Sequence, residues 1–288
     1  MNVANFPCVM GIINVTPDSF HADSRILEEQ SLRVRVRQIL DEGGSMLDVG
    51  ACSTRPGSPS VCEDEELARL RWALPIVADE LDAWVLHHPS SQRPLVSVDT
   101  FRAHVALECV TRLHADIIND ISGGTIEPQM LDVVAKTGAP YILMHMRGTP
   151  ETMQQLTDYP EGVTAEVSRF FRMQLQRLEE ACQRAGRSTL PQVILDPGYG
   201  FAKTVDQNYE LMRGLPSLMA DFPSYPMLVG ISRKSMIQRV LDIDASQALN
   251  GTTVLNTFAL LAGAHILRVH DVRPAVEALR LCAMLDHQ

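Results

Sequence analysis

The sequence predicts a single (β/α)8 barrel, the TIM-barrel fold, as one domain over residues 1–288. Two observations carry this prediction. Eight short apolar runs follow one another along the chain, and segments with helical spacing of apolar residues separate them. Strands that alternate with helices indicate parallel pairing, and eight such units close into a barrel. The length of 288 residues agrees with the roughly 250 residues typical of this fold.

Each apolar run is short and continuous, which is typical of a parallel strand buried on both faces. A polar residue lies within or soon after every run, and barrel enzymes do their chemistry at the mouth where the strands end. The runs are Cys8–Ile13 with Asn14, Ser45–Val49 with Asp48, Pro94–Val98 with Asp99, Asp116–Ile118 with Asn119, Tyr141–Met144 with His145, Gln192–Leu195 with Asp196, the run from Met227 with Ser232-Arg233-Lys234-Ser235, and His265–Leu267 with Arg268 and His270.

The segments between the runs predict the helices. Gly43-Gly44 ends the first of them in the usual C-terminal manner. Ser60 and Glu63 form a capping-box pattern that predicts the start of the second, and Pro75 is expected to kink it. The predicted helices are Ile26–Asp41, Ser60 to Trp84, Phe101–His114, Pro128–Lys136, Glu161–Ala185, Asn208–Ala220, Gln247–Leu261 and Pro274–Leu285.

Composition argues against two classes of partner. The net charge is −10, which disfavours nucleic acids and anionic membranes. No window approaches the ~20 apolar residues of a membrane span, and the N-terminus has no signal-peptide pattern. The six cysteines lack CxxC spacing, so we expect reduced thiols and a cytoplasmic protein.

Cations gather at two strand ends, against the overall sign of the charge. Arg233 and Lys234 together predict a cationic site for an anionic ligand. Arg268 and His270 alternate along the last strand, so their side chains are expected on one face. Barrels commonly bind phosphate at the last two strand–helix loops, where these four residues lie.

A set of motifs, all in order between about residues 8 and 280, resembles the dihydropteroate synthase family. The motifs are Gly11-Ile12-Ile13-Asn14-Val15-Thr16-Pro17-Asp18-Ser19-Phe20, Asp48-Val49-Gly50, Ser53-Thr54-Arg55-Pro56-Gly57, Ser97-Val98-Asp99-Thr100, Ile117-Ile118-Asn119-Asp120-Ile121-Ser122, Leu195-Asp196-Pro197-Gly198-Tyr199-Gly200-Phe201, Ser232-Arg233-Lys234-Ser235 and Arg268-Val269-His270-Asp271.

The resemblance implies a transferase of folate biosynthesis. Its substrates would be 6-hydroxymethyl-7,8-dihydropterin pyrophosphate and p-aminobenzoate, and its products 7,8-dihydropteroate and pyrophosphate. It also implies a homodimer and competition between sulfonamides and p-aminobenzoate.

The resemblance also distributes residues over the pterin and diphosphate subsites. Asp196 is the natural bidentate acceptor for the row of N–H donors on the pterin edge. Asp99, Asn119 and Lys234 would serve the other ring atoms. The catalytic residues would be Lys234, Arg268 and His270, and Phe201 and Val269 are further substrate-binding candidates. Each aspartate could instead cap a helix at a strand–helix junction.

Magnesium is the expected cofactor, with Asn14 as its protein ligand. A single amide is a weak metal site, so the ion is expected to arrive with the pyrophosphate, whose oxygens it shares.

The p-aminobenzoate subsite would be assembled from loops. Phe20 and Pro56 would clamp the ring, Ser235 and the helix start after it would face the carboxylate, and Thr54 and Arg55 would help to hold both ligands. The mechanism favoured under this resemblance is dissociative: pyrophosphate leaves first, and the aromatic amine then attacks a delocalised pterin-methyl cation. No protein nucleophile is required, and the sequence suggests no nucleophile–base pair.

Two other functions remain compatible with these motifs. A pterin- or folate-binding methyltransferase shares the barrel and the Asp/Asn contacts, but has no pyrophosphate to neutralise with Arg233, Lys234, Arg268 and His270. A non-catalytic paralogue that only binds pterins is the second.

Overall fold

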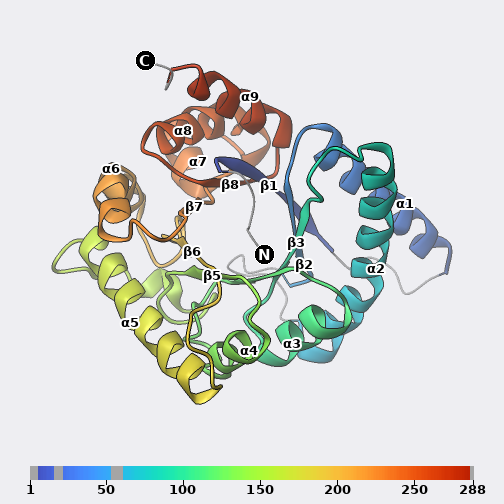
Figure 1. Cartoon of the computed structure of the whole chain (residues 1–288). Helices are drawn as coiled ribbons and strands as arrows, with labels where there is room; N and C mark the ends of the chain where they lie inside the picture. The colour runs from blue at the N-terminus through green and yellow to red at the C-terminus, as the bar shows by residue number, and fades with distance from the viewer. Residues whose placement is uncertain (1–5, 16–21, 53–60, 286–288) are drawn as a thin grey trace.

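The computed structural model describes residues 6–15, 22–52 and 61–285. Eight parallel strands form one sheet in the order β6-β5-β4-β3-β2-β1-β8-β7, with helices in a ring around it (Figure 1). The (β/α)8 barrel prediction is confirmed. The strands are β1 (Cys8–Asn14), β2 (Met46–Gly50), β3 (Leu95–Asp99), β4 (Ile117–Asp120), β5 (Tyr141–Met144), β6 (Val193–Asp196), β7 (Leu228–Val229) and β8 (Ile266–Val269).

A helix follows almost every strand, as the sequence predicts. In the described part of the chain, none of the helices is both long and apolar enough to span a membrane. The helices are α1 (Ala22–Asp41), α2 (Glu63–His87), α3 (Ala103–Arg112), α4 (Gln129–Thr137), α5 (Val163–Arg184), α6 (Val205–Asp221), α7 (Ser235–Leu241), α8 (Leu249–Leu261) and α9 (Val272–Ala283), with 3-10 turns at Met153–Gln155 and Ala245–Gln247.

The barrel is weakest between β6 and β7. An isolated parallel bridge, Leu195 to Met227, joins these two strands, and the Leu195 amide donates to the Pro226 carbonyl at 2.9 Å. Pro226 has no N–H to return a ladder bond. Strand β7 pairs with β8 over Leu228 and Val229 alone, so it is shorter than the apolar run from Met227 predicts.

Several helix boundaries differ from the sequence predictions, and for α6 a local cap explains the difference. Helix α6 begins at Val205, before the predicted Asn208, because Thr204 and Gln207 form a reciprocal capping box. Helix α2 begins at Glu63 after Cys62, which makes no side-chain cap bond, and continues through Pro75. Its predicted cap Ser60 lies outside the described residues. Helix α7 is an extra short helix ahead of the predicted Gln247–Leu261.

The barrel interior contains one apolar layer and, above it, one polar layer. The apolar layer is a cluster of buried residues from all eight strands: Cys8, Met10, Met46, Leu95, Ile117, Ile142, Ile194, Leu228 and Ile266. Because side chains alternate along a strand, the residue two positions later points to the same interior. In β2, β3, β4, β6 and β8 those positions hold Asp48, Ser97, Asn119, Asp196 and Arg268, whereas β1 and β5 have Ile12 and Met144 there. The alternation thus places a polar layer at the carboxyl ends of the strands.

The outer core packs the helices against the barrel, and α1 shows how closely. Ile39 is fully buried, and a Cβ built at Gly11 in β1 would lie 2.7 Å from Ile39 Cγ2. Helix α1 therefore contacts the strand backbone directly at Gly11.

Replacing Ile39 with alanine should lower the free energy of unfolding by about 2–5 kcal/mol, because a buried cavity replaces the side chain. Chemical denaturation followed by circular dichroism measures the change. Val34→Ala on the exposed side of the same helix is the control and should stay within about 0.5 kcal/mol. Equal losses in the two variants would contradict the packing of α1 on Gly11.

Candidate active site

A buried ionic network crosses the barrel at the polar layer. Arg268 in β8 donates from Nε to Asp48 Oδ2 at 2.7 Å and from Nη2 to Asp99 Oδ2 at 2.7 Å. Asn119 in β4 donates from Nδ2 to the same Asp48 oxygen at 3.1 Å. Residues from β2, β3, β4 and β8 are thereby held in one cluster. Among the described residues, Asp48 Oδ1 and Ser97 Oγ in this layer are buried without a hydrogen-bond partner.

The network holds one cation between two carboxylates, and this imbalance changes its titration. Burial raises the pKa of Asp99 to about 7, and the charge of Asp48 adds to this effect while Arg268 opposes it. Burial disfavours the charge of Arg268, but Asp48 and Asp99 raise its pKa above the usual value. Asp99 can consequently meet a ligand near neutral pH either as an acceptor or, when protonated, as a donor.

Asp196 lies at the end of β6, beneath a tight loop. Its Oδ1 accepts the Gly198 amide at 2.7 Å, and burial raises its pKa while the charge of Lys234 opposes the rise. Gly198 has a φ of 70°, and a Cβ there would lie 2.0 Å from the His145 carbonyl oxygen. Only glycine fits this position, because a side chain would push the loop off β5.

Lys234 contacts the same loop. Its Nζ donates to the Tyr199 carbonyl at 2.5 Å and lies 4.7 Å from the centroid of the Phe201 ring. Burial lowers the pKa of Lys234 to about 8, and Asp196 opposes that shift. A carboxylate, an ammonium group and an aromatic face are thus assembled around one loop.

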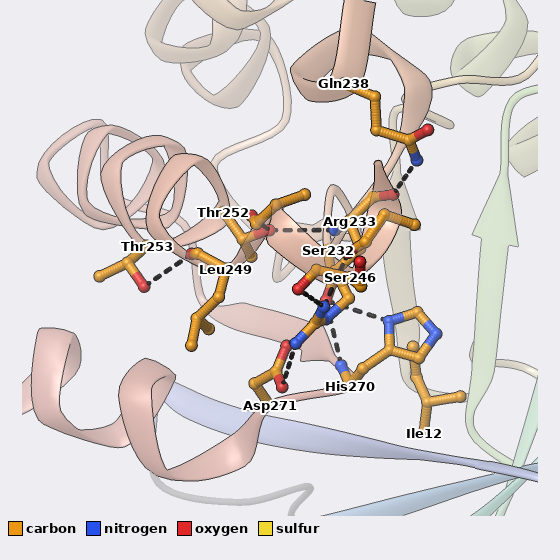
Figure 2. A network of polar contacts seen from close by, with 12 residues as sticks. Ile12, Ser232, Arg233, Gln238, Ser246, Leu249, Thr252, Thr253, His270 and Asp271 are labelled. Atoms are coloured by element: carbon orange, nitrogen blue, oxygen red, sulfur yellow. Dashed lines mark hydrogen bonds and ion pairs between the residues drawn. The ribbon is translucent and has the colours of Figure 1, made fainter. Parts of the chain in front are cut away.

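Arg233, next to Lys234 in sequence, faces away from this cluster. Its Nε and Nη2 bind the two oxygens of Asp271 at 2.7 and 2.9 Å, and its Nη1 donates to the carbonyls of Ala245 and Ser246 (Figure 2). The expectation that both adjacent cations face a ligand is wrong for Arg233. The backbone of Arg233 has a φ of 55°, in the left-handed region.

His270 is positioned by Ser232. The hydroxyl oxygen accepts the His270 amide at 3.1 Å and lies 3.0 Å from Nδ1 of the ring (Figure 2). Arg35 on α1 donates to the carbonyls of His270 and Ile12, at 2.6 and 3.2 Å. These contacts hold the ends of β1 and β8 together.

The other predicted site residues divide into two groups. Asn14 is exposed at the end of β1, Ser235 is the exposed first residue of α7, and Val269 is fully buried in β8. Phe20, Thr54, Arg55 and Pro56 lie outside the described residues. Within the described ranges, no three His, Cys, Asp or Glu side chains cluster as metal ligands.

The sequence argument omitted Asp48 and Ser232 from the site, although both orient predicted residues. The signal for Asp48 was present: it is an aspartate inside an apolar strand, two residues after the buried Met46. Ser232 gave no comparable signal, because its role depends on the approach of the loop after β8.

Comparison with known proteins agrees with this geometry. The profile of a family described as pterin binding enzyme matches residues 10–270. The barrel with its polar mouth is therefore that of the pterin-binding enzymes.

More specific relatives are dihydropteroate synthases. The Escherichia coli strain K12 enzyme is 39% identical over 277 residues, which cover 96% of this chain and 90% of that protein. The Yersinia pestis enzyme, solved as a sulfonamide drug complex, is 34% identical with a TM-score of 0.80, and the alignment covers 98% of this chain and 95% of that one. The Thermus thermophilus enzyme, solved in complex with 4-aminobenzoate, is 34% identical with a TM-score of 0.78, at the same coverage. The chain belongs to the dihydropteroate synthase family.

The lowered pKa of Lys234 predicts a pH limit on activity. Its ammonium is charged below about pH 8 and is lost above it, so kcat/KM for an anionic pterin substrate should fall as pH rises through about 8. The kcat/KM profile between pH 6.5 and 9.5 measures this. Lys234→Arg keeps the charge and should shift the descending limb upward. If kcat/KM falls over the same pH range in both enzymes, Lys234 is not the group whose titration causes the fall.

Proposed function

We propose that the chain condenses 6-hydroxymethyl-7,8-dihydropterin pyrophosphate with p-aminobenzoate to form 7,8-dihydropteroate and pyrophosphate in folate biosynthesis. The observation that carries the proposal is that Asp196, Lys234 and the Arg268 network lie together at the carboxyl ends of the strands. Relatives solved with a sulfonamide drug and with 4-aminobenzoate support the second substrate.

Asp196, Asp99 and Asn119 would bind the pterin ring. Gly198 holds Asp196 through Oδ1, and Arg268 holds Asp99 through Oδ2, so neither carboxylate needs to reorganise when the ring arrives. Lys234 would donate to an acceptor on the ring, exchanging its bond to the Tyr199 carbonyl. Phe201 and Val269 would provide apolar contacts.

Arg268 and His270 would receive the departing pyrophosphate. The contacts of Arg268 within the described chain use Nε and Nη2, which leaves Nη1 for a ligand oxygen. Charge that develops on the pyrophosphate oxygens would then meet preorganised donors.

Magnesium fits this mouth as a companion of the substrate. Asn14 offers one exposed amide oxygen at the end of β1, and the described residues show no carboxylate cluster that would bind the ion by itself. When bound, Mg²⁺ would neutralise charge on the pyrophosphate oxygens.

The p-aminobenzoate would bind at Ser235, the exposed first residue of α7, and at four loop residues: Phe20, Thr54, Arg55 and Pro56. The neutral aromatic amine would attack after pyrophosphate has left, which requires no protein nucleophile. Sulfonamides would compete at this subsite because they imitate the ring, the amine and the acidic group.

Lys234→Ala and Arg268→Ala should each lower kcat/KM at least tenfold, since loss of one preorganised contact to developing charge costs about 2.7–4 kcal/mol. The assay contains dihydropterin pyrophosphate, Mg²⁺ and p-aminobenzoate, and measures dihydropteroate and released pyrophosphate. Lys136→Ala, an exposed lysine on α4, is the control. Wild-type enzyme that binds pterin without product, or inhibition by sulfonamides that p-aminobenzoate does not relieve, would contradict the proposal.

The homodimer implied by the family resemblance has a suitable surface on α8 and α9. These two helices pack side by side and expose Val254, Phe258, Leu261 and Leu281, with Met284 and Leu285 just after α9. A second copy of the chain would cover this face around a two-fold axis. The six cysteines all lie in the described ranges and form no disulfide, which supports the proposal that the protein works in the reducing cytoplasm.

Phe258→Glu combined with Leu281→Glu should convert the dimer to a monomer, because each places a charge in an apolar interface. Light scattering after size-exclusion chromatography gives the mass. Leu86→Glu, an equally exposed leucine on α2, should leave the mass unchanged. A monomeric mass for the wild-type protein would contradict the dimer proposal.

A further inference from the structure

Lysine is rare in this chain. Among the 25 lysines and arginines only Lys136, Lys203 and Lys234 are lysines. Lys136 is exposed, whereas Lys203 is 4% exposed and lies in the loop between β6 and α6 that carries the site. A buried ammonium is costly unless each of its donors is satisfied.

Three acceptors surround the Lys203 ammonium. Its Nζ donates to the carbonyls of Gly198 at 2.9 Å and Phe201 at 3.0 Å, and lies 2.9 Å from His145 Nδ1. Burial holds the pKa of His145 well below its usual range, so the ring is neutral and Nδ1 can accept. The three N–H groups of an ammonium match these acceptors, whereas a planar guanidinium cannot point in all three directions.

Other side chains tie down the rest of this loop. Asn208 Oδ1 accepts the Gly200 amide at 2.6 Å, and the Tyr159 hydroxyl donates to the Ala202 carbonyl at 2.8 Å. Ala202 itself has a φ of 49°. The loop conformation therefore depends on contacts from side chains of neighbouring elements and not on a regular backbone ladder.

The same loop residues touch the ligand-binding groups on their other side. Gly198, whose carbonyl binds Lys203, donates its amide to Asp196 Oδ1. Phe201, whose carbonyl also binds Lys203, places its ring against Lys234 Nζ. Lys203 is thus linked to Asp196 through Gly198, and to Lys234 through Phe201.

We propose that Lys203 is a positioning residue that locks the β6–α6 loop on His145, and through Gly198 and Phe201 sets Asp196 and Lys234 for the pterin ring. The inference rests on the proposed function, because it assigns pterin recognition to Asp196 and Lys234. It concerns a residue that touches neither substrate. Burial lowers the pKa of Lys203 to about 7, and the charge of Asp196 opposes the shift.

Lys203→Met tests the proposal, because methionine keeps most of the stem and removes all three donors. The KM for dihydropterin pyrophosphate and the dissociation constant of dihydropterin, measured by calorimetry, should each rise at least tenfold. The KM for p-aminobenzoate should stay within twofold. Lys136→Met is the matched control and should change none of these values.

If Lys203 only stabilised the fold, its replacement would change the kinetic constants differently. Loss of folded enzyme lowers kcat and leaves both KM values unchanged, so pterin affinity within twofold of wild type in folded Lys203→Met would overturn the proposal. Lys203→Gln, which retains a shorter donor, should weaken pterin binding in the same direction but less. If neither variant folded, Lys203 would serve stability and the proposal would also fall. Pterin binding without turnover by the wild type would count against the proposed function alone.

Discussion

The whole mouth of the barrel depends on one guanidinium, that of Arg268, placed between the buried Asp48 and the partly buried Asp99. Without it, Asp48 and Asp99 would be like charges removed from water, and removing one partner from a buried ionic group costs about 3–5 kcal/mol. The single positive charge of Arg268 offsets the repulsion between Asp48 and Asp99, but two carboxylates beside one cation leave one excess negative charge. Burial raises the pKa of Asp99 to about 7, Arg268 opposes the rise, and the charge of Asp48 adds to it. The result is a polar layer prepared for a ligand rich in donors.

The sheet and the loops contribute different residues to the site. The sheet supplies residues that point inward at fixed heights, such as Asp48, Asn119 and Arg268. The loops supply Lys234 and the Phe201 ring, and they are held by side chains from elsewhere. Arg233 and Lys234 illustrate the division: one cation anchors the loop to Asp271, and the other faces the site.

Much of the fold could be predicted because its signals are local. Continuous apolar runs bounded by polar residues mark parallel strands, and their alternation with helices determines the barrel. The misses are local as well. Strand β7 contains only Leu228 and Val229, and α7 is too short to give a periodic signal. Phe20, Thr54, Arg55 and Pro56 remain predictions.

The sequence by itself determined the barrel, the strand ends that carry polar residues and the family resemblance, because each follows from the order and spacing of residue types. Only the tertiary structure decided which partners those residues choose. Asp48 and Arg268 are 220 positions apart, and the pairing register of β1, β2 and β8 brings them together. The contacts of Lys203 also depend on the tertiary structure. His145, Gly198 and Phe201 surround its ammonium only after β5 and β6 pair and the loop after β6 folds back.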